Sequence, residues 1–138
     1  MLKGKKITCV IPARMKSSRF PGKPLAKING REMVLCVADI AKQSQYIDEI
    51  IIATEDEIIR RLCEINGYQS RITGTHYTCT HRVAEVSKTL ESDYIVNLQG
   101  DEPLTDHRWL DDIIKYGVGY DFDMVQASRE LEPDEIDD

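Results

Sequence analysis

Short apolar runs alternate with amphipathic stretches along this chain, and this alternation restricts the fold more than any other feature. Four runs are β-branched and nearly continuous in apolar character, as expected for strands covered on both faces of a parallel sheet. These runs are residues 7–11, 49–54, 94–98 and 122–127. Between them, apolar residues recur at helical spacing. The predicted helices are residues 32–43, 55–66, 81–91 and 106–116.

This order of elements predicts an α/β fold in which a mostly parallel sheet is flanked by helices through right-handed crossovers. The second helix is expected to begin at Thr54, which has Glu57 three residues on as in a capping box, and to end at Gly67. The length of 138 residues, with no internal repeat or low-complexity linker, indicates one domain over residues 1–138. In such sheets the ligand crevice lies beyond the carboxyl ends of the strands.

The composition argues against several classes of function. The net charge of -6 and the pI near 5.1 disfavour non-specific binding of nucleic acid, because no net positive field attracts the phosphate backbone. No run approaches about 18 consecutive apolar residues, so no membrane span is expected. The apolar run near the N-terminus is too short for a signal peptide, which predicts a cytoplasmic protein. Cys9, Cys36 and Cys63 fall in predicted strands or helices and are expected to be buried thiols.

A basic loop follows the first predicted strand, although the chain as a whole is acidic. Its sequence, IPARMKSSRFPGKPL, places four cations within ten positions: Arg14, Lys16, Arg19 and Lys23. Arg14 and Lys23 can bracket a polyphosphate, because a guanidinium grips two oxygens and an ammonium acts as a point charge. Ser17, Ser18 and the amides of the following Pro-Gly turn can form an anion-binding concavity.

The basic loop matches neither of the common phosphate-binding motifs. It lacks the GxxxxGK[ST] pattern of a Walker A loop, and the chain has no GxGxxG for a dinucleotide. A solvated surface loop is the alternative reading of its composition. Its place at the crevice favours phosphate binding instead.

An acidic loop, NLQGDEPL at residues 97–104, follows the third predicted strand. Gly100 allows the backbone to turn sharply and present Asp101 at the edge of the crevice. Mg²⁺ takes one or two carboxylates and completes its shell with water and phosphate oxygens. A basic loop and an acidic loop at one crevice therefore predict a metal-nucleotide site, with Gln99 placed to read a base or a sugar. The alternative is a turn whose acids cap the next helix.

A third loop, TGTHYTCTHR at residues 73–82, is rich in hydroxyl groups. We expect it to hydrogen-bond a ligand, with Arg82 at the start of the third helix. A mobile loop is the alternative. His76, Cys79 and His81 suggest zinc, but a closed structural site needs four ligands and no fourth lies at a suitable spacing.

With these three loops the chain resembles the CMP-Kdo synthetases, the 3-deoxy-manno-octulosonate cytidylyltransferases. The resemblance runs from about residue 6 onward and is carried by IPAR with SSRFPGKPL, by THRVAEV and by VNLQGDEPL. It implies a Rossmann-like nucleotide-diphosphosugar transferase fold. It also implies a Mg²⁺-dependent nucleotidyltransferase that joins CTP to a 3-deoxy-ulosonic sugar acid, giving the CMP-sugar and pyrophosphate for cell-surface lipopolysaccharide synthesis. A homodimer is the implied assembly, without nucleic acid or membrane partners.

The resemblance also implies a role for individual residues. Arg14, Lys23 and Asp101 would be the catalytic residues, with Asp101 as the ligand of Mg²⁺. The sugar would contact Gln99 and Arg19. The residues implied for the nucleotide are Pro12, Ala13, Arg14, Ser17, Lys23, Thr80, Arg82 and Gln99.

The chain departs from this family in two respects. The family's SGTDR or SGTER reads TCTHR at residues 78–82, so that Cys79 replaces a glycine and His81 replaces an acid. Family members also continue well past residue 138, through a second metal carboxylate and much of the sugar pocket. The alternatives are therefore an inactive nucleotide-binding module, or a cytidylyltransferase for another acidic sugar such as an acylneuraminate. The Asp-x-Asp motif of many glycosyltransferases is absent, because residues 101–103 read Asp-Glu-Pro.

Overall fold

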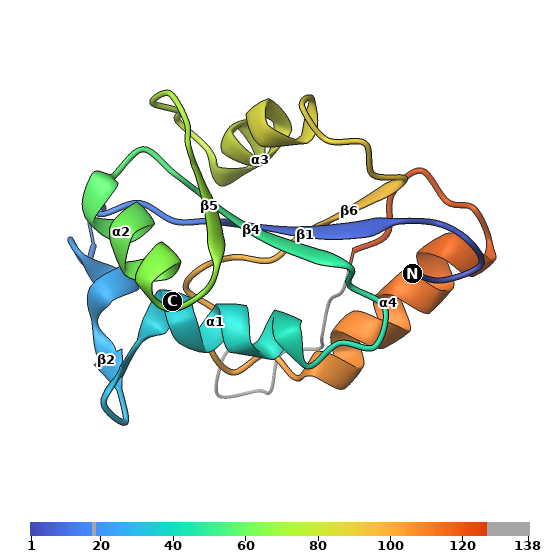
Figure 1. The fold of residues 1–138 in the computed structure, drawn as a ribbon, viewed down its shortest axis with the longest axis horizontal. Helices are drawn as coiled ribbons and strands as arrows, with labels where there is room; N and C mark the ends of the chain where they lie inside the picture. The colour runs from blue at the N-terminus through green and yellow to red at the C-terminus, as the bar shows by residue number, and fades with distance from the viewer. Residues whose placement is uncertain (18, 127–138) are drawn as a thin grey trace, which may run out of the picture.

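The computed structural model describes residues 1–17 and 19–126, and its centre is a sheet of four parallel strands (Figure 1). The strands lie in the order β5-β4-β1-β6. Their bounds are β1 Ile7–Pro12, β4 Glu49–Thr54, β5 Gln69–Ile72 and β6 Tyr94–Asn97. In the register, Pro12 lies opposite Ala53 of β4, and Asn97 lies opposite Val10 of β1. All four strands therefore run the same way and end at the same edge of the sheet.

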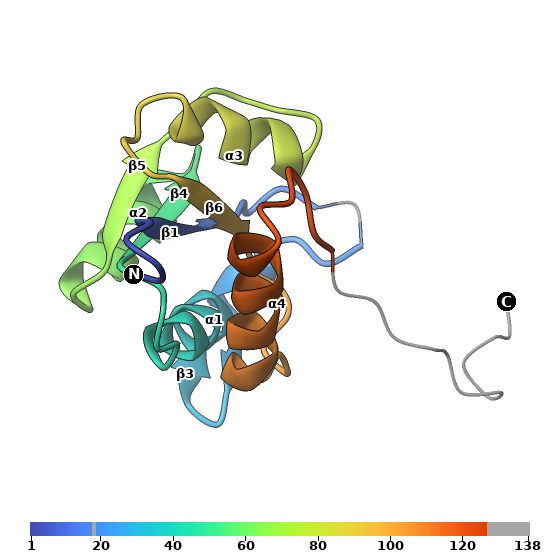
Figure 2. The ribbon, with the colours of Figure 1, turned by 90° about the vertical axis from the view of Figure 1, so that its right-hand side faces the viewer.

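Helices cover both faces of this sheet. Their bounds are α1 Met33–Lys42, α2 Glu57–Ile65, α3 Cys79–Ser87 and α4 His107–Gly119. Figure 2 shows α3 on one face, with α1 and α4 together on the other. The α/β architecture predicted from the alternation of strands and helices is confirmed.

Alternation along β1 supplies both layers of the core. Cys9 and Ile11 pack with Leu35 of α1 and Ile59 of α2 on one face. Val10 points the other way and packs with Val83 and Val86 of α3, together with Ile51 and Ala53 of β4. Every residue of β1 is buried, which explains why this strand reads as a continuous apolar run.

Two buried thiols confirm part of the prediction for the cysteines. Cys9 and Cys63 are buried, and desolvation raises the pKa of each thiol to about 12. The prediction is wrong for Cys36, which is partly exposed and lies with its Sγ 3.6 Å from the carbonyl oxygen of Arg31.

The start of α2 differs from the predicted capping box. The N-cap is Asp56, and the Thr54 hydroxyl accepts the Asp56 N–H at 3.1 Å instead of capping the helix. The Asp56 carboxylate is occupied elsewhere, because it accepts the N–H of Met15 at 2.8 Å. The predicted end is confirmed, since Gly67 has φ +86° and its N–H bonds to the Glu64 carbonyl.

The predicted strand at 122–127 is wrong over residues 122–126, and Ala127 lies outside the described residues. This segment turns back toward α4, where Val125 Cγ2 lies 3.6 Å from the position of a β-carbon on Gly117. Met124 is largely exposed, so the apolar run does not enter the core. Across residues 1–17 and 19–126, no helix is long and apolar enough to cross a membrane.

Three short features were missed from the sequence: an edge strand, a hairpin of two strands and a 3₁₀ turn. β5 is an edge strand whose residues are mostly exposed, so it carries no apolar run. The hairpin of β2 (Lys27–Ile28) and β3 (Arg31–Glu32) turns at Asn29 and Gly30, both with positive φ. Asn-Gly is a strong hairpin signal that was available in the sequence. The third is a 3₁₀ turn, η1 (Lys23–Leu25).

Candidate nucleotide site at the carboxyl ends of the strands

A pocket of about 170 Å³ lies where β1 and β6 end. It draws residues from the basic loop, from the acidic loop and from the first residue of α3. The lining residues are Pro12, Ala13, Arg14, Lys16, Ser17, Lys23, Pro24, Cys79, Gln99, Gly100 and Asp101. The basic and acidic loops therefore meet at this edge of the sheet, as predicted from their positions after two parallel strands.

Gly100 permits the close approach of these two loops. Its N–H lies 3.3 Å from the carbonyl oxygen of Pro12. A β-carbon at this position would lie 2.8 Å from that oxygen and 3.3 Å from Cβ of Ala13. Any larger residue would therefore push the acidic loop away from the end of β1.

The path of the basic loop is fixed at two points. Asp56 accepts the Met15 N–H, which ties the loop to the start of α2. The Gly22 N–H then donates to the carbonyl of Met15 at 2.7 Å, and Gly22 has φ +76°. This left-handed residue leads into η1, whose first residue is Lys23. Asp56 is a structural residue of the site that sequence reasoning missed.

Lys23 and Asp101 meet across the pocket. The Nζ of Lys23 lies 3.5 Å from Oδ2 of Asp101, and the two side chains are 38% and 54% exposed. An ion pair this open to solvent is weak. Both groups can therefore turn to a ligand that offers a phosphate and a metal ion.

Arg14 and Ser17 occupy the same wall. The Nη1 of Arg14 lies 3.5 Å from the carbonyl oxygen of His76, so the third loop borders the guanidinium. The Ser17 hydroxyl oxygen accepts the N–H groups of Arg19 and Phe20, each at 3.3 Å. Its own proton remains available to a ligand oxygen. Ser18 lies outside the described residues.

The acidic loop presents Gln99 beside Asp101. The Gln99 amide donates to the side-chain oxygen of Asn97 at 2.9 Å. This bond orients the side chain at the rim of the pocket, where its carbonyl oxygen remains available to a ligand.

Three predicted site residues lie outside the lining of the pocket: Arg19, Thr80 and Arg82. Arg82 is fully buried, donates from Nε to the Thr73 hydroxyl at 3.0 Å, and places Nη2 3.3 Å from Oε1 of Glu55. It thus lies beneath the third loop. Lys16 and Cys79 line the pocket without having been assigned to it from sequence.

The two histidines of the third loop have separate partners. His76 Nε2 lies 3.0 Å from Oε1 of Glu85, whereas His81 Nδ1 lies 2.8 Å from the Thr78 hydroxyl. In the described part of the chain, no three His, Cys, Asp or Glu side chains are grouped to hold a metal ion.

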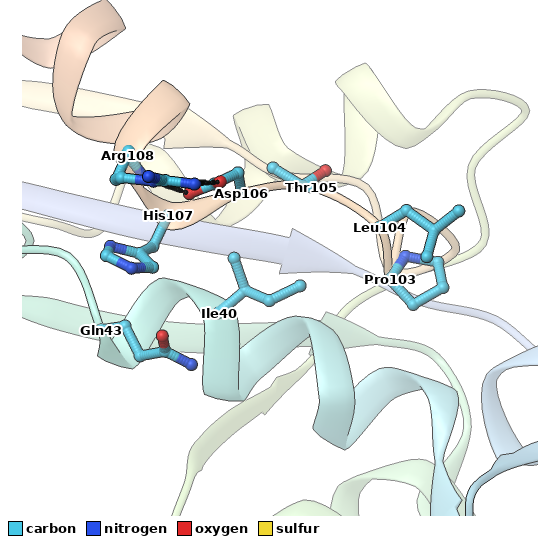
Figure 3. A pocket seen from close by; sticks show the side chains of 8 residues that line it. All are labelled: Ile40, Gln43, Pro103, Leu104, Thr105, Asp106, His107 and Arg108. Atoms are coloured by element: carbon cyan, nitrogen blue, oxygen red, sulfur yellow. Dashed lines mark hydrogen bonds and ion pairs between the residues drawn. The ribbon is translucent and has the colours of Figure 1, made fainter.

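A second, more open hollow of about 530 Å³ lies between α1 and the start of α4 (Figure 3). Its walls include Ile40 of α1, Gln43 at the C-cap of that helix, and the segment 103–108. The Arg108 guanidinium is turned onto the Asp106 carboxylate, with Nη2 2.6 Å from Oδ2. This hollow shares no lining residue with the candidate site, and the guanidinium in its wall is already paired.

Comparison with known proteins identifies the family of the chain. Residues 8–130 match the family model described as Cytidylyltransferase. The chain belongs to this cytidylyltransferase family. Its curated relatives include the 3-deoxy-manno-octulosonate cytidylyltransferase of Anaeromyxobacter sp., which is 36% identical over 96% of this chain and 55% of the relative. The same enzyme of Pelobacter propionicus is 46% identical over 79% of this chain and 43% of the relative.

Solved structures of cytidylyltransferases share the fold. CMP:2-keto-3-deoxy-manno-octonic acid synthetase complexed with CTP superposes with a TM-score of 0.80 at 36% identity. The match covers 83% of this chain and 48% of that one. A cytidylyltransferase from Leptospira borgpetersenii superposes with a TM-score of 0.72 at 27% identity, over 83% and 50% of the two chains. The chain thus spans about half the length of the relatives it matches, and the nucleotide-diphosphosugar transferase fold is confirmed for that half.

Proposed function

We propose that this chain carries the nucleotide-binding part of a CMP-Kdo synthetase, a 3-deoxy-manno-octulosonate cytidylyltransferase. In the proposed reaction, CTP and a 3-deoxy-ulosonic sugar acid give the CMP-sugar and pyrophosphate. The supporting observation is the pocket in which Arg14, Lys23 and Asp101 converge at the carboxyl ends of β1 and β6. The names of the curated relatives and the CTP complex of a structural neighbour support the choice of nucleotide and sugar.

The proposed roles follow from the chemistry of each side chain. Arg14 and Lys23 hold the triphosphate, with Ser17 donating to a phosphate oxygen. Gln99 contacts the base or the sugar from the opposite wall. The backbone at Pro12 and Ala13 bounds the pocket beneath the nucleotide. Arg19, Thr80 and Arg82, which lie outside the lining, stay predictions from the family resemblance.

The exposed carboxylate of Asp101 makes the pocket suitable for a magnesium ion. Asp101 offers a half-exposed carboxylate at the rim, beside the cations that would hold phosphate oxygens. Mg²⁺ is commonly bound through one carboxylate, substrate phosphates and water. When bound, the ion would withdraw charge from the phosphate oxygens. Asp101 would hold it, while Arg14 and Lys23 orient the triphosphate.

The chain's own residues act by positioning and by electrostatics. The anomeric hydroxyl of the sugar attacks the α-phosphorus and releases its proton to solvent, the bond from that phosphorus to the bridging oxygen breaks, and pyrophosphate leaves. Lys23 and Arg14 stabilise the negative charge that accumulates on the leaving group. No covalent enzyme intermediate is needed for this transfer.

We further propose that the protein acts in the cytoplasm, as a homodimer, in the synthesis of lipopolysaccharide. These assignments rest on the family resemblance read from the sequence. They are tested by fractionation and by the mass of the protein in solution.

A second candidate is favoured by one observation: Cys79 lines the pocket at a position where the family resemblance implies a glycine. This candidate is a nucleotide-binding module that binds CTP without turning it over. An assay for pyrophosphate release in the presence of CTP, Mg²⁺ and the sugar acid separates the two. Release supports the enzyme, and binding without release supports the module.

Calorimetric titration of CTP, UTP and ATP, with and without Mg²⁺, tests the nucleotide site itself. The proposed function predicts micromolar binding of CTP that exceeds that of UTP and depends on Mg²⁺. Absence of binding by all three nucleotides would contradict it. Comparing 3-deoxy-manno-octulosonate with an acylneuraminate in the pyrophosphate assay then tests the effect of Cys79 and His81 on the choice of sugar.

A further inference from the structure

Residues 74–76 of the third loop are held in place by two carboxylates rather than by burial. Oε1 of Glu85 accepts the Gly74 N–H at 3.1 Å and lies 3.0 Å from Nε2 of His76. Oε2 of Glu55 accepts the Thr75 hydroxyl at 2.7 Å. Three consecutive residues are therefore anchored by side chains from outside the loop, and Tyr77, which follows them, is almost fully exposed.

Glu85 is connected to the candidate site through His76. It contacts the loop on both sides of Thr75, and the carbonyl of His76 is the group that borders Arg14 Nη1 at 3.5 Å. The hydrogen bond from the Gly74 N–H and then the bond from His76 lower the pKa of Glu85, despite its surface position. The carboxylate is therefore ionised at neutral pH, the form that accepts the Gly74 N–H.

Glu55, unlike Glu85, also pairs with a buried charge. Its other oxygen, Oε1, lies 3.3 Å from the buried Arg82 guanidinium, whose Nε donates to Thr73. Removal of Glu55 would leave a buried charge without compensation and would disturb the fold broadly. Glu85 is half-exposed and its ion pair is with His76; the buried Arg82 acts on it only as a weaker charge interaction, so we expect its removal to act locally.

We propose that Glu85 is a positioning residue for the nucleotide site. By holding Gly74 and His76 it fixes the carbonyl oxygen against which the Arg14 guanidinium rests. Arg14 is thereby kept at the pocket wall before a nucleotide arrives, with its remaining N–H groups free for phosphate oxygens. This inference rests on the proposed function, because it takes Arg14 as a ligand of the triphosphate.

A double-mutant cycle on CTP affinity tests the proposal. The four proteins are the wild type, Arg14→Ala, Glu85→Ala and the double variant, each titrated with Mg²⁺-CTP by calorimetry. Coupled residues in one network show non-additive effects. We expect Glu85→Ala to weaken CTP binding about threefold to tenfold in the wild-type background. In the Arg14→Ala background it should have no further effect. Glu91→Ala, at an exposed residue beyond the end of α3, serves as the control and should leave the affinity unchanged.

The outcome of the cycle distinguishes a positioning role of Glu85 from a purely structural one. An equal loss in both backgrounds would show that Glu85 only stabilises the fold, and no loss in the wild type would also overturn the proposal. If Arg14→Ala binds CTP normally, Arg14 is not a phosphate ligand, and both the proposed role of Arg14 and this inference fail. If Glu85→Ala does not fold, Glu85→Gln replaces it in the same cycle. The neutral amide still accepts the Gly74 N–H, so we expect a smaller but equally Arg14-dependent loss.

Discussion

The Nζ of Lys23 lies 3.5 Å from Oδ2 of Asp101, so the proposed phosphate ligand and the proposed metal ligand contact each other in the free protein. Lys23 follows the turn at Gly22, and Asp101 follows the close approach at Gly100. The pair thus joins the two loops that leave β1 and β6. Because both groups are partly exposed, Mg²⁺ and phosphate can replace their contact with little loss of free energy.

Removing either cation should weaken nucleotide binding. We expect Arg14→Ala and Lys23→Ala each to reduce the free energy of Mg²⁺-CTP binding by about 1.5–3 kcal/mol, the scale of a hydrogen bond to a charged group. Calorimetry measures the change. Lys27→Ala is the matched control, because Lys27 is an exposed lysine of the β2–β3 hairpin that does not line the pocket. Wild-type affinity in both variants would rule out phosphate binding here.

Asp101→Asn should remove the effect of magnesium on CTP binding. Without the metal, the variant should bind CTP at least as tightly as the wild type, because a carboxylate that repels phosphate has been neutralised. With the metal, it should gain little affinity, because the amide is a poorer ligand for Mg²⁺. Titrations at several Mg²⁺ concentrations give both values. Glu102→Gln, at the next residue, is the control, and a wild-type response to Mg²⁺ in Asp101→Asn would refute the assignment.

Gly100→Ala should destabilise the protein and impair the site together. The new β-carbon would lie 2.8 Å from the Pro12 carbonyl oxygen, so the acidic loop must shift. Overpacking of this kind lowers the free energy of unfolding by about 1–3 kcal/mol. Urea unfolding measures it, with CTP titration as the second readout. Gly119→Ala is the control, since a β-carbon on Gly119 would have no neighbour within 4 Å, and its stability should be unchanged or raised.

Asp106 should contribute to the acid sensitivity of the fold. The Arg108 guanidinium, followed by the Arg108 N–H, lowers the pKa of Asp106 from 3.8 to about 2. A carboxyl with a lowered pKa stabilises the folded state above its unfolded pKa and loses this effect as the pH falls through the folded value. Its contribution should therefore be complete above about pH 4 and vanish toward about pH 2.

Urea unfolding of the wild type and Asp106→Asn across this pH range measures that contribution. Asparagine retains the helix cap on α4, so the variant differs chiefly in charge. We expect the difference in unfolding free energy to shrink as the pH falls. Asp112→Asn, at an exposed residue of the same helix, is the control. A difference that stays constant down to about pH 2 would contradict the prediction.

Mg²⁺-CTP should protect Cys79 from alkylation. Cys79 lines the pocket and is partly exposed, whereas Cys9 and Cys63 are buried with raised pKa values and should react slowly. Replacing the partly exposed Cys36 by serine leaves Cys79 as the accessible thiol among the described residues. Mass spectrometry then follows the reaction with iodoacetamide. An unchanged rate at saturating CTP would show that the nucleotide does not cover this wall.

The buried elements of the fold were the ones that the sequence predicted well. β1 and β4 are apolar because they pack on both faces, and the helices between strands show their buried faces as periodic apolar residues. β5 was missed because an edge strand with mostly exposed side chains has no such pattern. The segment 122–126 was wrongly predicted because a short apolar run does not reveal whether a neighbouring strand will pair with it.

The location of the candidate site was predictable, but its inner contacts were not. The basic and acidic loops could be placed at one edge because parallel strands end together. Arg82 ends the stretch read from the sequence as the third loop, yet it lies in α3 and its side chain is buried. Asp56 was missed because its carboxylate reaches Met15 from 41 residues away. Such long-range bonds leave no local pattern in the sequence.

Among the described residues, β6 pairs with β1 on one side only. No strand among the described residues pairs with the backbone groups on its other side, and no charged residue interrupts Tyr94–Asn97 to discourage pairing there. Amide hydrogens on that side should exchange with solvent faster than those of β1. In concentrated solution the same row can template strand addition between molecules. The strand that leads into the acidic loop thus also governs how well the isolated domain resists aggregation.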